Sequence, residues 1–137
     1  MSVISELIRI ETDATISFGN YELEQKAKLE NFEYAGDVYK VKTFKEITKL
    51  ERNGLFVYES VPGTVVHRLK ITDQGVSFSV EGMKDVQITV DLEANAEYRV
   101  VIDEHEAGIM KANLGGKLSF GVELGQTKKV AVAIEKV

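Results

Sequence analysis

The sequence predicts an all-β protein, an antiparallel β-sandwich of about ten short strands in an immunoglobulin-like or jelly-roll-like arrangement. Apolar and polar residues alternate along short segments such as residues 98–102 and 118–122, so that each segment would bury one face and expose the other. Turn residues separate the segments at roughly the 8–12-residue spacing typical of a sandwich. No segment requires a long helix.

The first half of the chain contains two ambiguous segments and one strong hairpin signal. Residues 3–10 fit a helix or a strand, and we favour a strand that leads into a hairpin with residues 15–18. Residues 21–34 are interpreted as a strand, with a helix over 22–29 as the alternative, because Glu, Gln, Lys and Ala are good helix formers. Strands are also predicted at 38–44 and 55–58, the second after the turn pair Asn53-Gly54.

In the second half of the chain, apolar and polar residues alternate more regularly. Strands are predicted at residues 64–71, 76–80, 86–92, 98–102, 117–124 and 130–134. Asp103 to Glu106 are expected to form a polar loop that Gly108 closes. We expect the strand at 130–134 to pair with 117–124 across a turn at 125–127.

Length and composition limit the function classes. With 137 residues and 44% hydrophobic content, the chain is expected to form one domain, with a sub-boundary near residues 82–95 as the alternative. The absence of cysteine excludes thiol chemistry and Cys-ligated metals. A net charge of -5 argues against a general nucleic-acid binder. The N-terminus carries Glu6 and Glu11 and has no long apolar run, so we expect a cytoplasmic protein without a membrane segment.

Two resemblances add to this interpretation. YRVVID at residues 98–103, Gly108, and GKLSFGVEL at 116–124 resemble small immunoglobulin-like modules, which occur as accessory units in bacterial glycosidases and surface proteins. The chain departs from those modules at Glu104, where they commonly have Gly in an Asp-Gly turn. ISFGNY at 16–21, DVYKVKT at 37–43 and YESVPGT at 58–64 resemble a family of small uncharacterised bacterial proteins, some of them labelled endosialidase-like.

The endosialidase activity does not carry over to these residues. Sialic-acid cleavage needs several arginines around the substrate carboxylate and an activated tyrosine. The chain has four arginines, which are scattered along it: Arg9, Arg52, Arg68 and Arg99. No residue of this sequence is therefore assigned to a family active site.

No catalytic constellation stands out. His67 and His105 could meet around a metal with Asp103 or Glu106, but an exposed strand histidine and an exposed loop histidine are the simpler interpretation. No pair of acids is singled out among 22, and neither a Gly-x-Ser-x-Gly elbow nor a phosphate-binding loop occurs. We predict no catalytic residue, no metal site and no cofactor, and lean against an enzyme.

Tyrosines are the candidate binding residues. Tyr34, Tyr39 and Tyr58 lie on neighbouring predicted strands and, with Phe32 and Phe56, could form an aromatic platform for a sugar or a protein. The competing interpretation, which we favour, places most of these rings in the core.

Three functional hypotheses follow. The first is a non-catalytic interaction module that binds a protein partner or self-associates through a sheet edge or aromatic face. The second is a carbohydrate-binding accessory module, which requires exposed tyrosines. The third is a small hydrolase, which requires a cleft with two close acids.

Overall fold

A computed structural model describes residues 3–125 and 129–137. These residues form thirteen strands and no helix, which confirms the predicted all-β sandwich and adds to the predicted number of strands. No helix in the described part is therefore long and apolar enough to cross a membrane. The strands are β1 (Ile8–Ile10), β2 (Ile16–Phe18), β3 (Ala27–Tyr34), β4 (Asp37–Phe44), β5 (Ile47–Arg52), β6 (Leu55–Val61), β7 (Val65–Thr72), β8 (Gly75–Glu81), β9 (Val86–Asp91), β10 (Glu97–Ile102), β11 (His105–Lys111), β12 (Lys117–Val122) and β13 (Val130–Lys136).

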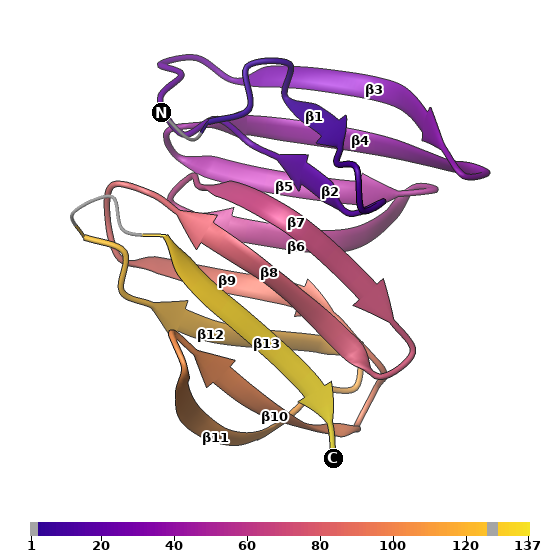
Figure 1. Ribbon diagram of the computed structural model, residues 1–137, viewed down its shortest axis with the longest axis vertical. Helices are drawn as coiled ribbons and strands as arrows, with labels where there is room; N and C mark the ends of the chain where they lie inside the picture. The colour runs from indigo at the N-terminus through magenta and orange to yellow at the C-terminus, as the bar shows by residue number, and fades with distance from the viewer. Residues whose placement is uncertain (1–2, 126–128) are drawn as a thin grey trace.

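Two antiparallel sheets pack face to face. Sheet A has seven strands in the order β1-β2-β7-β8-β13-β10-β11, and sheet B has six in the order β12-β9-β6-β5-β4-β3. Figure 1 shows β7, β8 and β13 toward the viewer, with β9 and β12 passing behind β8 and β13. The strands of each sheet alternate between buried and exposed side chains, so the two inner faces form the core and the two outer faces meet solvent.

Three hairpins are closed by turn pairs in which both residues have positive φ. Ala35-Gly36 joins β3 to β4 with φ values of 53° and 85°. Asn53-Gly54 joins β5 to β6 with φ values of 54° and 78°, and the Asn53 side chain also accepts the Val38 N–H at 2.9 Å. This predicted turn is confirmed. Asp103-Glu104 joins β10 to β11 with φ values of 53° and 67°. Mirror-type two-residue turns need this conformation because their twist matches that of the flanking strands.

The core is centred on Tyr58, which is fully buried. Its ring meets Phe18 and Phe78 of the opposite sheet edge-on, at centroid distances of 5.3 and 5.6 Å. Its hydroxyl lies 2.9 Å from the Thr64 hydroxyl, which is also 2.8 Å from that of Ser60. The apolar ring and the satisfied hydroxyl together let a tyrosine occupy the middle of the sandwich.

The structure decides the two segments of the first half that were ambiguous in sequence. The N-terminal hairpin is confirmed, because β1 pairs with β2. Residues 21–34 contain β3 and no helix, so the helical alternative over 22–29 is wrong. Residues 82–95, the suggested sub-boundary, include β9, whose Val86, Ile88 and Val90 belong to the main buried cluster with residues of both sheets.

Two predicted features of the C-terminal third are wrong. Only Asp103 and Glu104 form the turn, because His105 and Glu106 already pair with β10 as the start of β11. β13 does not pair with β12. It lies between β8 and β10 in sheet A, whereas β12 pairs with β9 in sheet B. The chain therefore crosses between sheets after β12, and residues 126–127 of the predicted turn lie outside the described residues.

Candidate functional site

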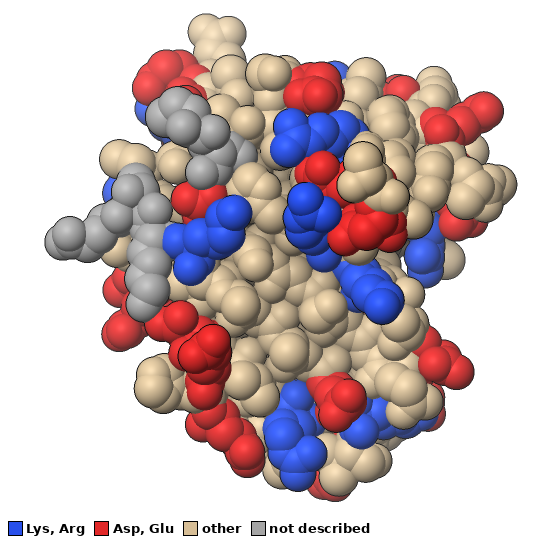
Figure 2. Space-filling model, in the orientation of Figure 1, with Lys and Arg blue, Asp and Glu red and all other residues tan. Residues whose placement is uncertain are grey.

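A shallow groove of about 380 Å³ lies on the outer face of sheet A. Its floor consists of small side chains, Ser77 and Ser79 on β8 and Ala131 and Ala133 on β13, which face each other as cross-strand pairs. Figure 2 shows an uncharged area in the middle of this face, with charged atoms of both signs around it. The groove exists because these two central strands carry small outward residues between strands with larger ones.

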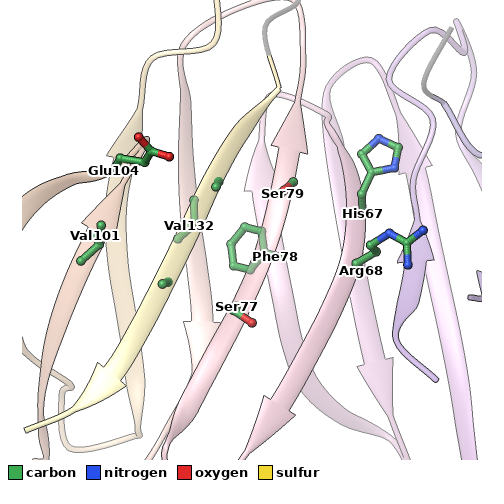
Figure 3. Close-up of a pocket in the computed structure, with 10 residues that line it drawn as sticks. His67, Arg68, Ser77, Phe78, Ser79, Val101, Glu104 and Val132 are labelled. Atoms are coloured by element: carbon green, nitrogen blue, oxygen red, sulfur yellow. The ribbon is translucent and has the colours of Figure 1, made fainter. Parts of the chain in front are cut away.

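The groove walls come from strands on either side of the floor. His67 and Arg68 of β7 form one wall, and Val101 and Glu104 form the other (Figure 3). The pairing of β7 shifts register after His67, and Arg68 adopts a φ of 57° there. The buried Ser17 hydroxyl accepts the Arg68 N–H at 3.1 Å, which holds this bulge. Bulges redirect side chains, and this one places Arg68 at the groove rim.

His67 is paired with a buried carboxylate. Its Nε2 lies 3.1 Å from Glu81 Oε2, and the two side chains are only 12% and 9% exposed. Burial lowers the pKa of His67, the nearby charge of Lys129 lowers it further, and the opposing effect of Glu81 is smaller. At neutral pH the imidazole is therefore neutral and donates its Nε2 proton to Glu81.

The groove provides contacts but no acid–base pair. Among the described residues that line it, Glu104 is the one carboxylate, whereas glycoside hydrolysis requires two. The hydroxyls of Ser77 and Ser79 can bond to an extended segment lying across the floor. The hydrolase hypothesis gains no support from this surface.

A larger pocket of about 860 Å³ lies at one end of the sandwich, next to the β2–β3, β4–β5, β6–β7 and β8–β9 connections. Apolar Val61 and Met83 line it and are 52% and 63% exposed. Its acids are exposed, and the 81%-exposed Glu24 forms an ion pair with Lys45 at 2.9 Å. A carboxyl that acts as general acid needs an apolar surrounding, which these acids lack.

The predicted tyrosine platform is not formed on the surface. Tyr39 and Tyr58 are 5% and 0% exposed on the inner face of sheet B, and Tyr34 is half-buried against the core. Tyr39 shares its face with Val41, as alternation requires, and Tyr58 pairs with the inward-facing Leu50. The carbohydrate hypothesis therefore loses the three tyrosines on which it was based.

Phe56 lies on the outer face of sheet B, and this placement was not predicted from the sequence. A register shift after Leu50 pairs Phe56 with Glu51 on the outer face of sheet B, although Phe56 and Tyr58 are two residues apart. Simple alternation would place both rings on one face. Nothing in the sequence marks a bulge of this kind, so its effect was not predictable.

The two histidines do not meet. His67 lies on β7 and His105 begins β11, with β8, β13 and β10 between them in sheet A. Within residues 3–125 and 129–137, no group of three His, Cys, Asp or Glu side chains is placed to hold a metal. The metal-site alternative is therefore wrong for the described residues.

The four sheet edges differ in how well they are protected. β1 has only three residues, and β3 contains a bulge with Asn31 at a φ of 62°. β11 pairs through a register shift and contains Gly108 at a φ of 113°. Short length, bulges and charge discourage an edge from pairing with another chain.

β12 differs from the other edges. It pairs with β9 at six consecutive positions without a register shift, and none of its residues has positive φ. Its outward-facing residues are Lys117, Ser119 and Gly121, and the Lys117 side chain forms an ion pair with Asp91 of β9 at 2.7 Å. Among the edges that the described residues form, β12 is the one that is both longer than three residues and without a bulge.

Comparisons of the chain with protein-family models, with curated proteins and with solved structures found no match.

Proposed function

We propose that the protein is a non-catalytic β-sandwich module that self-associates by pairing β12 of one copy with β12 of another. The observation that carries this proposal is the regular, unbulged edge of β12 beside three shortened or bulged edges. On the outer side of β12 the Lys117 N–H and C=O are already bonded to Asn113. The backbone groups of Ser119 and Gly121 alternate onto the same side, and an identical antiparallel strand would pair with them.

Edge pairing of identical strands gives a closed dimer. Antiparallel partners are related by a two-fold axis perpendicular to the sheet, so each copy uses the same surface and no further copy can be added there. The outward residues near the axis, Ser119 and Gly121, are small and uncharged, and therefore impose neither steric clash nor repulsion. Sheet B would become a twelve-stranded sheet across the pair.

The test is the mass in solution, measured by size-exclusion chromatography with light scattering over a range of protein concentrations. We expect twice the 15.2 kDa mass of one chain at high concentration and dissociation on dilution. Ser119→Lys places like charges across the two-fold axis and should give monomers. Ser119→Glu should do the same, and an equal mixture of the two variants should restore the dimer.

A matched control tests the edge of the other sheet. Ala107→Lys adds the same charge to the exposed side of β11, and the dimer should persist. A wild-type monomer at every concentration would overturn the proposal. So would a dimer that survives Ser119→Lys, or a mixture of the two Ser119 variants that stays monomeric although each variant is folded by circular dichroism.

A further inference from the structure

Three lysines form a row across the outer face of sheet B. Lys28 on β3 pairs with Lys42 on β4, which pairs with Lys49 on β5. Neighbouring strands are about 4.8 Å apart, so the row presents three ammonium groups to solvent along one line. Burial lowers the pKa of Lys42, and the charges of Lys26, Lys28, Lys49 and Lys40 lower it further.

Carboxylates meet this row only at its β5 end. Lys49 forms an ion pair with Glu51 at 3.6 Å and has Glu59 of β6 as its other cross-strand neighbour. The flanking Lys40 pairs with Glu30 at 3.5 Å. Within the described residues, no carboxylate lies in ion-pair distance of Lys28 or Lys42. The chain has 22 acidic residues and a net charge of -5, so the shortage of acids around Lys28 and Lys42 is local.

Edge protection does not explain the row. Lysines on edge strands discourage aggregation, but β4 and β5 are interior strands of sheet B. Like charges directly opposite each other on neighbouring strands destabilise a sheet. A costly arrangement at interior positions fits an anionic ligand that supplies the missing negative charge.

Two aromatic rings lie beside the row on the same face. Lys26 Nζ lies 5.9 Å from the ring centre of Phe44, and Lys49 Nζ and Lys117 Nζ lie 6.0 and 5.1 Å from that of Phe56. Both rings are partly exposed. Flat apolar rings next to ammonium groups suit a ligand that alternates apolar C–H faces with acid groups, which is the chemistry of an acidic sugar chain.

We propose that the outer face of sheet B binds an acidic polysaccharide, with Lys28, Lys42 and Lys49 contacting its carboxylates or sulfates and Phe44 and Phe56 packing against its sugar rings. This site is on the wide face of sheet B, whereas the self-association proposed above uses its edge. The two proposals rest on different residues and can fail separately.

The test measures binding of the full chain to polygalacturonate and chondroitin sulfate by isothermal titration calorimetry, with dextran as the uncharged comparison. We expect binding to at least one acidic polymer, none to dextran, and at least tenfold weaker binding when salt is raised from 50 to 300 mM. The triple variant Lys28→Gln, Lys42→Gln, Lys49→Gln should lose at least tenfold in affinity.

The control is a triple variant with the same charge change away from this face: Lys70→Gln, Lys84→Gln, Lys111→Gln. It should bind within twofold of the unmodified chain. Equal losses in the two triple variants would overturn the proposal, because they would indicate attraction by overall charge. Absence of binding to both acidic polymers would also overturn it, as would tighter binding to anionic lipid vesicles or to single-stranded DNA.

Discussion

Thr48 and Thr64 are joined by two hydrogen bonds that run in opposite directions. The Thr48 hydroxyl donates to the Thr64 carbonyl oxygen at 2.9 Å and accepts the Thr64 N–H at 3.0 Å. The Thr43 hydroxyl lies a further 2.8 Å from that of Thr48, and all three residues are fully buried. One hydroxyl of sheet B therefore fixes the segment that leads into β7 of sheet A.

Replacing Thr48 with Val keeps the shape of the side chain and removes this hydroxyl. We expect Thr48→Val to lower the free energy of unfolding by about 2–4 kcal/mol, because two buried backbone groups of Thr64 lose their partner. Urea unfolding measures the change. The control is Thr89→Val on the outer face, where the hydroxyl bonds to Ser119 at 2.7 Å and the loss should stay within about 0.5 kcal/mol. Similar losses in both variants would contradict the buried role of Thr48.

His67 should make stability depend on pH. Because burial holds the pKa of His67 below its ordinary value of about 6.5, the unfolded chain binds this proton more readily than the folded chain. The stabilisation is fully present above about pH 7.5 and is lost as pH falls through about 6.5 toward the lowered pKa. Thermal unfolding measured at a series of pH values should show that Tm falls as the pH is lowered from about 7.5 to below about 6.5.

Two histidine variants separate this effect from other titrations. His67→Gln keeps a donor for Glu81 and should flatten the pH dependence in that window. His105→Gln, at an exposed position on β11, should leave it unchanged. Stability that rises as pH falls through 6.5 would show that the sign is wrong.

Gly75 is required where β8 approaches β13. A Cβ at this position would lie 1.8 Å from the Ile134 carbonyl oxygen, and φ is 151°. Gly75→Ala should therefore cost about 2–4 kcal/mol of unfolding free energy. Gly36→Ala is the matched control, because φ is 85° but no atom lies within 4 Å, and we expect a loss of only about 1–2 kcal/mol. Equal losses would mean that backbone conformation alone explains the effect.

Neutralising Lys42 should stabilise the fold even though it weakens the proposed anion site. Lys42 faces lysines on both neighbouring strands, so Lys42→Gln removes two repulsive pairs and should raise the free energy of unfolding by about 0.5 kcal/mol. The gain should shrink at high salt, because salt screens these charges. Lys70→Gln on sheet A should show no such gain. A loss of stability in Lys42→Gln would indicate that the row is not strained.

The fold was predictable where local chemistry decides it. Alternation identified most strands, and Asn53-Gly54 identified its hairpin, because positive φ at two successive residues favours this pair. Asp103-Glu104 forms the same kind of turn without glycine, so the hairpin it closes was missed. β11 was missed as well. Both faces of this edge strand are largely exposed to solvent, so apolar and polar residues do not alternate regularly along it.

The sites were less predictable because they depend on which strands become neighbours. The outward position of Phe56 depends on a register shift after Leu50, and the lysine row depends on the pairing of β3, β4 and β5. Three lysines at positions 28, 42 and 49 show no pattern along the chain. They form a surface feature only once two hairpins bring them into register.

The two proposed surfaces predict avidity when both are present. Pairing through β12 would place both lysine rows in one continuous twelve-stranded sheet, roughly 40 Å apart at 4.8 Å per strand. A long polysaccharide can span both rows, whereas a short oligosaccharide cannot. We expect the dimer to bind long chains at least tenfold more tightly than short ones.

The equal mixture of the Ser119→Lys and Ser119→Glu variants tests this without a change in mean charge. Ser119→Lys and Ser119→Glu alone should bind long and short chains of the same polysaccharide with similar affinity per site. Their equal mixture should regain the preference for long chains. Because its mean charge equals that of the unmodified chain, overall charge would not explain this gain. If the mixture dimerises and shows no such preference, the two lysine rows do not act on one ligand. If either variant alone keeps the preference, the avidity does not come from pairing through β12.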